Sequence, residues 1–114
     1  MDNCLFCKII KGDIPTNKVY ENDHVLAFRD IDPKAPVHIL VIPKKHIKSI
    51  NDLESSDKYL AGELILASKK IAKDQGIDSK GFRTIFNTND DGGQTVYHIH
   101  MHIMGGRQMK WPPG

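Results

Sequence analysis

Near its C-terminal end the sequence contains a strictly alternating run of apolar residues and histidines, and this run constrains the fold more than any other feature. Val96 to Met104 reads VYHIHMHIM, with apolar residues between its three histidines. In a β-strand, residues i, i+2 and i+4 lie on one face. The run therefore predicts a strand over 96–104, with one apolar face in the core and a row of imidazoles on the other face. The row comprises His98, His100 and His102.

A row of imidazoles has several chemical uses. Histidine can act as a nucleophile, a general acid or base, or a metal ligand, because its pKa lies near neutrality. The segment Asn89 to Thr95, NDDGGQT, precedes the row and is rich in glycine and small polar residues. Such a turn can direct successive backbone N–H groups at an anion. A phosphate-binding turn beside imidazoles indicates phosphoryl or nucleotidyl transfer.

These residues resemble a known family. His98 to Met104, HIHMHIM, resembles the histidine triad (HIT) motif, in which three histidines alternate with apolar residues. The tail Gly105 to Gly114, GGRQMKWPPG, is similar to that of the Hint branch, and the resemblance extends back to Phe6. It implies an enzyme that binds purine nucleoside monophosphates and hydrolyses their 5′-phosphoramidates, at the P–N bond between AMP and an amine. It also implies a two-fold homodimer.

The resemblance implies a role for each site residue. His100 would attack the α-phosphorus and form a nucleotidyl intermediate, which water then hydrolyses. We expect the other ring nitrogen of His100 to donate to a backbone carbonyl, and His102 to hold non-bridging oxygens. His38 matches the histidine that assists the triad, and His98 completes the catalytic set. The implied substrate-binding residues are Asp30 at the ribose, Ile31, Asn87, Gly93, Gln94 and Thr95, together with His100 and His102. The expected apolar walls are Phe6, Ile14, Phe28, Ile31 and Leu40. No cofactor is required for this chemistry.

The cysteines are a separate feature. Cys4 and Cys7 are the only two in the chain and form a single CxxC. Such a pair supplies half of a tetrahedral zinc site, so two more ligands must come from elsewhere. The candidates are His46 and His98, an arrangement that microbial HIT relatives with a CxxC also suggest. A structural Zn²⁺ at these four residues, two buried thiols and a redox pair all stay open.

Two other functions compete with the phosphoramidase. One is a zinc hydrolase that binds its ion through His98, His100 and His102, although three histidines on one strand do not easily converge on a tetrahedral ion. The other is a nucleotide-binding regulatory or scaffold module, whose role would survive replacement of His100.

Length and composition set the remaining limits. With 114 residues we expect one domain, 1–114. A net charge of +2, without a basic run that contains aromatic residues, argues against nucleic acid as a partner. No apolar run reaches the roughly 18 residues of a membrane helix. The start MDNCLFCK lacks the features of a signal peptide, so we expect a cytoplasmic protein.

The whole pattern predicts an α+β fold, with an antiparallel sheet of about five strands, one long helix and a short N-terminal helix. Apolar residues at helical spacing, from Leu60 to Ile71, predict the long helix between Ser55 and Gly76. Prolines at 112 and 113 predict an extended tail, and Trp111 suggests an interface there. In Hint relatives this tail approaches the partner's active site. The remaining expected elements are a helix over 4–11 and strands over 18–21, 24–30, 37–43 and 82–87.

Overall fold

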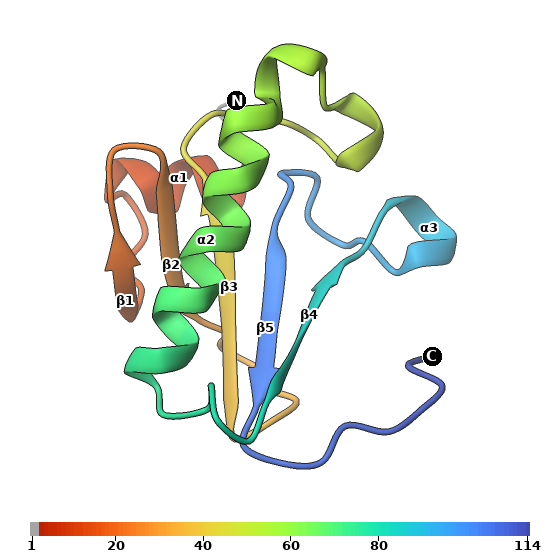
Figure 1. Ribbon diagram of the computed structural model, residues 1–114. Coiled ribbons are helices and arrows are strands. Elements are labelled where there is room, and N and C mark those ends of the chain that lie inside the picture. Colours follow the sequence, from red (N-terminus) through yellow and green to blue (C-terminus); the bar gives the residue numbers. More distant parts are fainter. Residues whose placement is uncertain (1–2) are drawn as a thin grey trace.

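Five antiparallel strands form a single sheet in the order β1-β2-β3-β5-β4 (Figure 1). In the computed structural model, which describes residues 3–114, the strands are β1 (Lys18–Glu21), β2 (Val25–Arg29), β3 (Val37–Pro43), β4 (Phe82–Phe86) and β5 (Met101–Gly105). The helices are α1 (Leu5–Lys11), α2 (Lys58–Asp74) and α3 (Asn89–Gly92), with 3-10 turns at Ile50–Asp52 and Ser55–Asp57. The expected α+β fold, with its long helix and short N-terminal helix, is confirmed. α3 and the 3-10 turns are not among the expected elements.

α2 covers one face of the sheet with its apolar side (Figure 1). Leu64, Ala67 and Ile71 are buried, as their helical spacing predicts. The helix ends just before Gly76, whose φ of 72° lies in the left-handed region that favours glycine. The strand residues packed beneath α2 are Val25, Ala27, Ile39, Val41, Met101 and Ile103.

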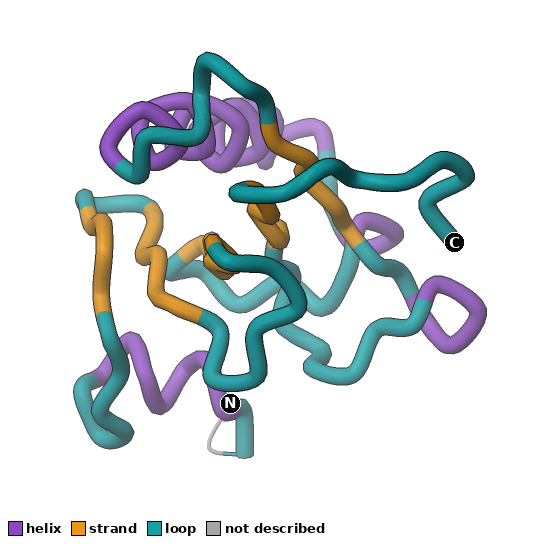
Figure 2. The backbone as a smooth tube through the Cα atoms, turned by 90° about the horizontal axis from the view of Figure 1, so that it is seen from below, coloured by secondary structure: helices purple, strands orange, loops and turns teal. Residues whose placement is uncertain are grey.

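The opposite face carries a second apolar cluster beneath α1, so the two helices lie on opposite sides of the sheet (Figure 2). α1 contributes Phe6 and Ile9, both buried as expected. The sheet contributes Leu26, Phe28, Leu40 and Ile42. Alternate residues of β2 thus enter different cores, which is why all but its last residue are buried.

The strand expected over 96–104 is only partly formed, because β5 begins at Met101. Met101 lies opposite Val41 of β3 and Phe86, the last residue of β4. Before this point β4 has ended, and Pro43 at the end of β3 has no N–H to donate. Residues 97–100 therefore have no ladder to join. The N–H of Ile99 instead donates to the carbonyl of Ile47 at 2.6 Å. Tyr97, expected in the core, is 41% exposed, whereas His98 and His100 are buried.

After β5 the chain leaves the sheet as an extended tail (Figures 1 and 2). Two arginines hold its base, since Arg83 donates to the carbonyl of Lys110 at 2.9 Å and Arg107 donates to that of Lys34 at 3.0 Å. Beyond these bonds Trp111 is 83% exposed. Within the described residues, no helix has the length and apolarity needed to cross a bilayer.

Candidate active site

His100 is held as a neutral imidazole with one nitrogen free. Its Nδ1 lies 2.8 Å from the carbonyl oxygen of His98, and a carbonyl can only accept, so Nδ1 carries the proton. The lone pair is then on Nε2, as a nucleophile requires. The ring is buried, and burial lowers its pKa. The expected backbone hydrogen bond is therefore present.

His102 is oriented by a chain of hydrogen bonds that begins at a backbone amide. The N–H of Lys34 donates to Nδ1 of His38 at 3.0 Å, so a neutral His38 carries its proton on Nε2. That nitrogen lies 2.9 Å from Nδ1 of His102 and donates to it. A neutral His102 must then keep its own proton on Nε2. A backbone amide is a permanent donor. The chain of hydrogen bonds that starts at Lys34 therefore leaves Nε2–H of His102 as a hydrogen-bond donor.

Burial keeps both members of this pair neutral. Burial is the main cause that lowers the pKa of His38, and the carboxylate of Asp30 partly opposes it. The pKa of His102 falls to about 4, through burial first and then through the neighbouring His100 and His38. Oδ2 of Asp30 lies 3.4 Å from Nε2 of His38, at the site's edge. Oδ1 of Asp30 accepts from the N–H of Asp32, so one carboxylate oxygen stabilises the loop.

His98 turns its ring away from this pair and toward the cysteines. Its Nε2–H donates to the carbonyl of Pro43 at 2.8 Å, which leaves the lone pair on Nδ1. Nδ1 lies 3.4 Å from Sγ of Cys4 and 3.6 Å from Sγ of Cys7. It is also 3.1 Å from Nδ1 of His46. The expected set of Cys4, Cys7, His46 and His98 thus forms a cluster, with all four candidate ligand atoms within 4.8 Å of one another.

These separations fit a tetrahedral zinc ion. With zinc–ligand bonds of about 2.3 Å to sulfur and about 2.0 Å to nitrogen, neighbouring sulfur and nitrogen ligands are about 3.5 Å apart. Three of the four sulfur–nitrogen pairs of the cluster are 3.4, 3.5 and 3.6 Å apart. Burial, and then the adjacent Cys4, raise the pKa of the Cys7 thiol, so two thiolates at this distance require a cation. A zinc ion would supply that charge.

The glycine-rich loop is folded differently from the expected phosphate cradle. α3 ends in Gly93, whose φ is 80°, and the N–H of Gly93 donates to Asp90 at 3.0 Å. The N–H of Gln94 donates to Asn89 at 3.0 Å. Both amides are therefore used within the loop. Thr95 is exposed, and neither its N–H nor its hydroxyl is taken up by another group in residues 3–114.

Gln94 has a structural position rather than the expected contact with substrate. Its side chain is buried, and its amide nitrogen donates to the carbonyls of Lys48 at 2.7 Å and Val96 at 3.1 Å. Its amide oxygen accepts from the N–H of Asn89 at 3.0 Å. The side chain holds the loop in this structure, so the expected contact with substrate would require Gln94 to exchange at least one of these hydrogen bonds.

The other expected substrate residues differ in exposure. Ile31 is 99% exposed on the loop after β2, where it can lie over a bound base but forms no wall. Asn87 directly follows β4 and is half-buried. Phe6, Phe28 and Leu40 are buried in the second core, and Ile14 packs against it. Phe6 touches His100, since the two ring centroids are 5.1 Å apart in an edge-to-face arrangement.

Sequence reasoning missed the backbone groups of this site. The amide of Lys34 and the carbonyl of Pro43 fix two of the imidazoles, but side-chain identity gives no signal for them.

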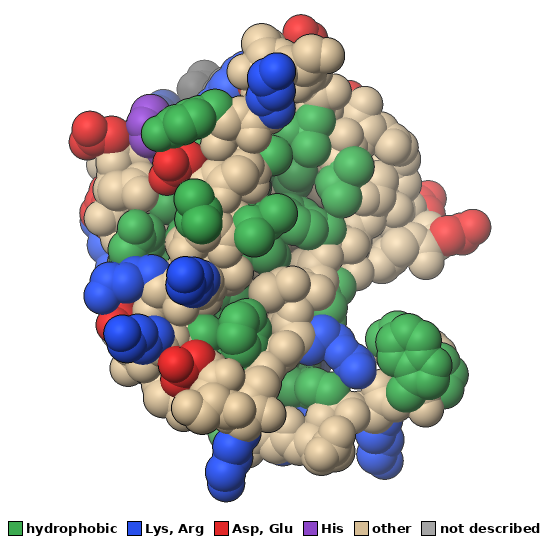
Figure 3. All heavy atoms as spheres, in the orientation of Figure 1, with side chains coloured by type: hydrophobic (Ala, Val, Ile, Leu, Met, Phe, Trp, Pro, Cys, Tyr) green, Lys and Arg blue, Asp and Glu red, His purple; other side chains and the backbone are tan. Residues whose placement is uncertain are grey.

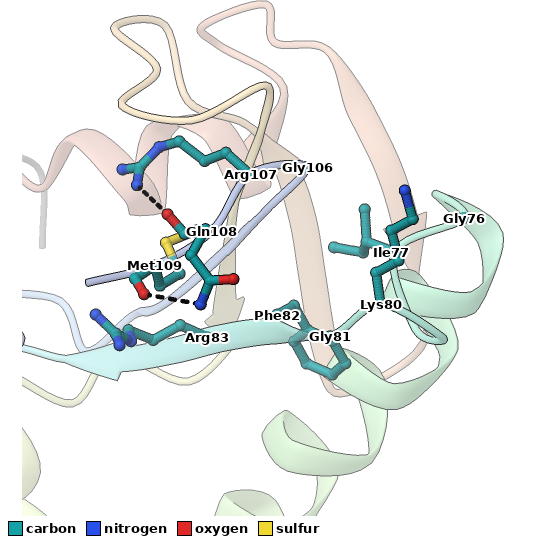
Figure 4. Close-up of a pocket in the computed structure, with 10 residues that line it drawn as sticks. All are labelled: Gly76, Ile77, Lys80, Gly81, Phe82, Arg83, Gly106, Arg107, Gln108 and Met109. Atoms are coloured by element: carbon teal, nitrogen blue, oxygen red, sulfur yellow. Dashed lines mark hydrogen bonds between the residues drawn. The ribbon is translucent and has the colours of Figure 1, made fainter. Parts of the chain in front are cut away.

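A large cavity lies elsewhere, at the other end of β5 (Figure 4). Its volume is about 560 Å³. None of the six histidines lines it, so it is separate from the histidine site. The lining residues come from the end of α2, the start of β4 and the base of the tail: Gly76, Ile77, Lys80, Gly81, Phe82, Arg83, Gly106, Arg107, Gln108 and Met109.

Comparison with known proteins shows the family of this chain. The model of the HIT domain family matches residues 11–109. A HIT-like protein of Synechococcus elongatus is 50% identical over 113 residues, which are 99% of this chain and 98% of that protein. The purine nucleoside phosphoramidase of Escherichia coli is 48% identical over 108 residues, which are 95% of this chain and 91% of that enzyme.

A solved structure is similar to this chain over nearly its whole length. The crystal structure of a HIT family hydrolase from Legionella pneumophila superposes with a TM-score of 0.96 at 54% identity, covering 98% of this chain and 100% of that one. A five-stranded sheet, with three alternating histidines at the start of β5 and just before it, is what this chain shares with histidine triad proteins. The chain belongs to the HIT family.

Proposed function

We propose that this HIT protein hydrolyses purine nucleoside 5′-phosphoramidates through a covalent nucleotidyl intermediate on His100. The observation that carries the proposal is the proton on Nδ1 of His100, which the His98 carbonyl holds and which leaves Nε2 free to attack. The identity of 48% to a purine nucleoside phosphoramidase supports the choice of substrate.

The reaction has two displacement steps. Nε2 of His100 attacks the α-phosphorus, the P–N bond breaks, and the nitrogen takes a proton from solvent and leaves as the amine. Water then attacks the same phosphorus and gives a proton back to solvent, the bond from phosphorus to Nε2 breaks, and AMP leaves, which regenerates His100. One water is consumed, and one AMP and one amine are formed. Dividing the displacement in this way replaces one difficult step with two easier ones.

The other groups of the site stabilise charge. Nε2–H of His102, fixed by the chain from Lys34 through His38, donates to a non-bridging oxygen as negative charge develops there. The free N–H and hydroxyl of Thr95 are further donors. Asp30 accepts from the ribose hydroxyls. None of these steps needs a metal ion.

A single turnover tests the nucleophile. Mixing the protein with an adenosine 5′-phosphoramidate and measuring intact mass should show a transient nucleotidyl adduct, which peptide mapping places on His100. His100→Asn should lower kcat by at least about 10³-fold, because the covalent route is lost, while AMP still binds. Leu5→Ala, an exposed change on α1, is the matched control. An adduct on another histidine would contradict the assignment.

We also propose that Cys4, Cys7, His46 and His98 hold one structural Zn²⁺. The fit of their separations to a tetrahedral ion supports this set. The ion would join α1 to the segment before β5 and would neutralise the thiolates.

Elemental analysis of protein that has never met a chelator should give about one zinc per chain, as a single tetrahedral site requires. Cys4→Ser should remove the metal and lower the melting temperature, because metal binding to the folded state stabilises it. Native protein without metal, with both thiols free to react, would refute the site.

A further inference from the structure

We infer that metal binding at the cluster of Cys4, Cys7, His46 and His98 is coupled to nucleotide binding at His100, and that Phe6 carries the coupling. The inference rests on the proposed function, because it needs a nucleotide at His100. It goes further, since it assigns the cysteines and Phe6 a positioning role in the reaction site.

The first observation is that His98 belongs to both sites. Its ring nitrogen Nδ1 lies in the cluster, 3.4 Å from Cys4 and 3.6 Å from Cys7. Its backbone carbonyl accepts the Nδ1–H of His100 at 2.8 Å. The side chain and the carbonyl belong to one residue, so a change in the ring's position also moves the acceptor that orients the nucleophile.

The second observation is the position of Phe6, which lies between the two cysteines in sequence. Its ring is 3% exposed and meets three rings edge-on. The centroid distances are 5.1 Å to His100, 5.9 Å to His98 and 5.6 Å to Phe28. Phe6 is therefore the direct contact between the cysteine-bearing helix and the nucleophile.

The third observation is that α1 is short and has few attachments. It has seven residues, and an isolated helix shorter than about 12 residues is marginal in water, so packing must hold it. Its attachments are the buried side chains of Phe6 and Ile9, the partly buried Ile10 and the cysteine cluster. Losing the cluster removes the polar attachment, and the helix then samples positions in which Phe6 leaves the His100 ring.

A cluster that holds zinc thus favours the arrangement in which Phe6 packs on the His100 ring and the His98 carbonyl accepts its Nδ1–H. A nucleotide seated on His100 selects the same arrangement. Two ligands that favour one state raise each other's affinity by the same factor. We expect a factor of about ten, within the range usual for coupled sites.

The test measures both affinities and needs no turnover. Calorimetry gives the Kd for AMP in zinc-loaded and zinc-free protein, and competition with a chromogenic chelator gives the Kd for zinc with and without saturating AMP. Removing zinc should weaken AMP binding about tenfold, and AMP should tighten zinc binding by the same factor. The chelator experiment starts from loaded, folded protein, so it stays decisive where the metal-free chain is unstable.

Two variants locate the coupling. Phe6→Leu keeps an apolar side chain but lacks the ring edge, so it should bind zinc normally while the coupling factor falls toward one. Leu5→Ala changes a side chain on the same helix that is 44% exposed, and it should keep the full factor. Turnover adds a further readout, since zinc removal should raise KM more than it lowers kcat.

The outcomes separate the inference from the function on which it rests. A zinc affinity that AMP leaves unchanged within about twofold, in a protein that binds AMP and hydrolyses phosphoramidates, overturns the coupling alone. A coupling factor that persists in Phe6→Leu overturns the role of Phe6. Absence of AMP binding in loaded protein overturns the proposed function and the inference together.

Discussion

His98, His100 and His102 are chemically identical side chains, yet each ring is held by a different partner. The carbonyl of Pro43 accepts from Nε2–H of His98, and the carbonyl of His98 accepts from Nδ1–H of His100. His38 donates to Nδ1 of His102, so the proton of that ring is on Nε2. The imidazole lone pairs therefore lie on different atoms and in different directions, with that of His98 at the cysteines and that of His102 at His38. This divergence disfavours a zinc hydrolase in which all three imidazoles bind one ion.

The neutral imidazoles predict how stability depends on pH. Free histidine has a pKa near 6.5. Burial lowers the pKa of His102 to about 4 and also lowers that of His38. Between pH 6.5 and 4 the unfolded chain binds more protons, so the free energy of unfolding should fall as pH decreases through this window. Above pH 6.5 the contribution is fully present.

Urea unfolding at several pH values between 4 and 7.5 measures this slope. His102→Asn should flatten it, because one proton-binding difference disappears. His24→Asn is the matched control, since His24 is exposed and lies outside the buried histidine pair. A slope that His102→Asn does not reduce would contradict the assignment.

Sequence could identify the residues of the site better than their contacts. The histidine spacing identified the triad, and neutral-imidazole chemistry required the backbone acceptor that His100 has. Gln94 shows where this reasoning fails. A glutamine beside two glycines in a loop looks free to bind phosphate, but three backbone groups brought together by folding saturate it. Which groups those are depends on loop geometry, which side-chain identity does not encode.

At the level of elements, strand length depends on the neighbouring strands as well as on the pattern. The alternation from Val96 to Met104 continues through residues that are not strand, because β4 ends opposite Met101 and Pro43 has no N–H. The helix of seventeen residues and the strand Val37–Pro43 match their predictions, since each reflects a periodicity satisfied within the element or by both neighbours. α3 was missed because four residues set no period.

Gly105 gives a prediction at this scale, because β5 and the segment after α2 approach closely there. A Cβ on Gly105 would lie 2.7 Å from Cδ1 of Ile77 and 3.2 Å from its Cβ. Gly105→Ala should therefore lower the free energy of unfolding by about 1–3 kcal/mol, the usual cost of overpacking.

Removing Cδ1 should relieve this clash. Ile77→Val in the Gly105→Ala background should cost less than Ile77→Val alone, and denaturant unfolding of the four proteins gives the coupling. Additive effects would show that the two residues do not clash.

At the scale of the whole molecule, several apolar side chains face solvent on one side. Tyr59, Ile65 and Leu66 of α2 are 60–69% exposed, and Figure 3 shows apolar side chains spread over this face. β4 is an edge strand with one side unpaired. Exposed apolar area beside an open strand edge is typical of an interface. We propose that a second copy of the chain covers it, as a two-fold homodimer.

The extended tail offers a second surface to the proposed dimer. Arg83 and Arg107 anchor its base, whereas Trp111 beyond them is 83% exposed, and apolar side chains at this end stand apart from the body across a notch (Figure 3). A tryptophan with so large an apolar area favours an interface. We propose that it lies beside the partner copy's histidine site and contacts the amine of the substrate.

Deleting residues 110–114 should then leave the dimer and the affinity for AMP within about twofold, because it removes one hydrogen bond to the sheet edge, from Arg83 to Lys110, and no contact to the histidine row. The ranking of amine leaving groups should change, with aromatic amines losing about tenfold in kcat/KM relative to aliphatic ones, as expected when an aromatic contact of 1–1.5 kcal/mol is lost. Trp111→Ala should reproduce the deletion, and Lys110→Ala should not, because it keeps the carbonyl that Arg83 binds. Sedimentation measures the dimer, and a series of adenosine phosphoramidates measures the ranking. Unchanged relative kcat/KM values across that series would rule out a role for the tail, and a monomer at working concentration would rule out its placement beside a partner.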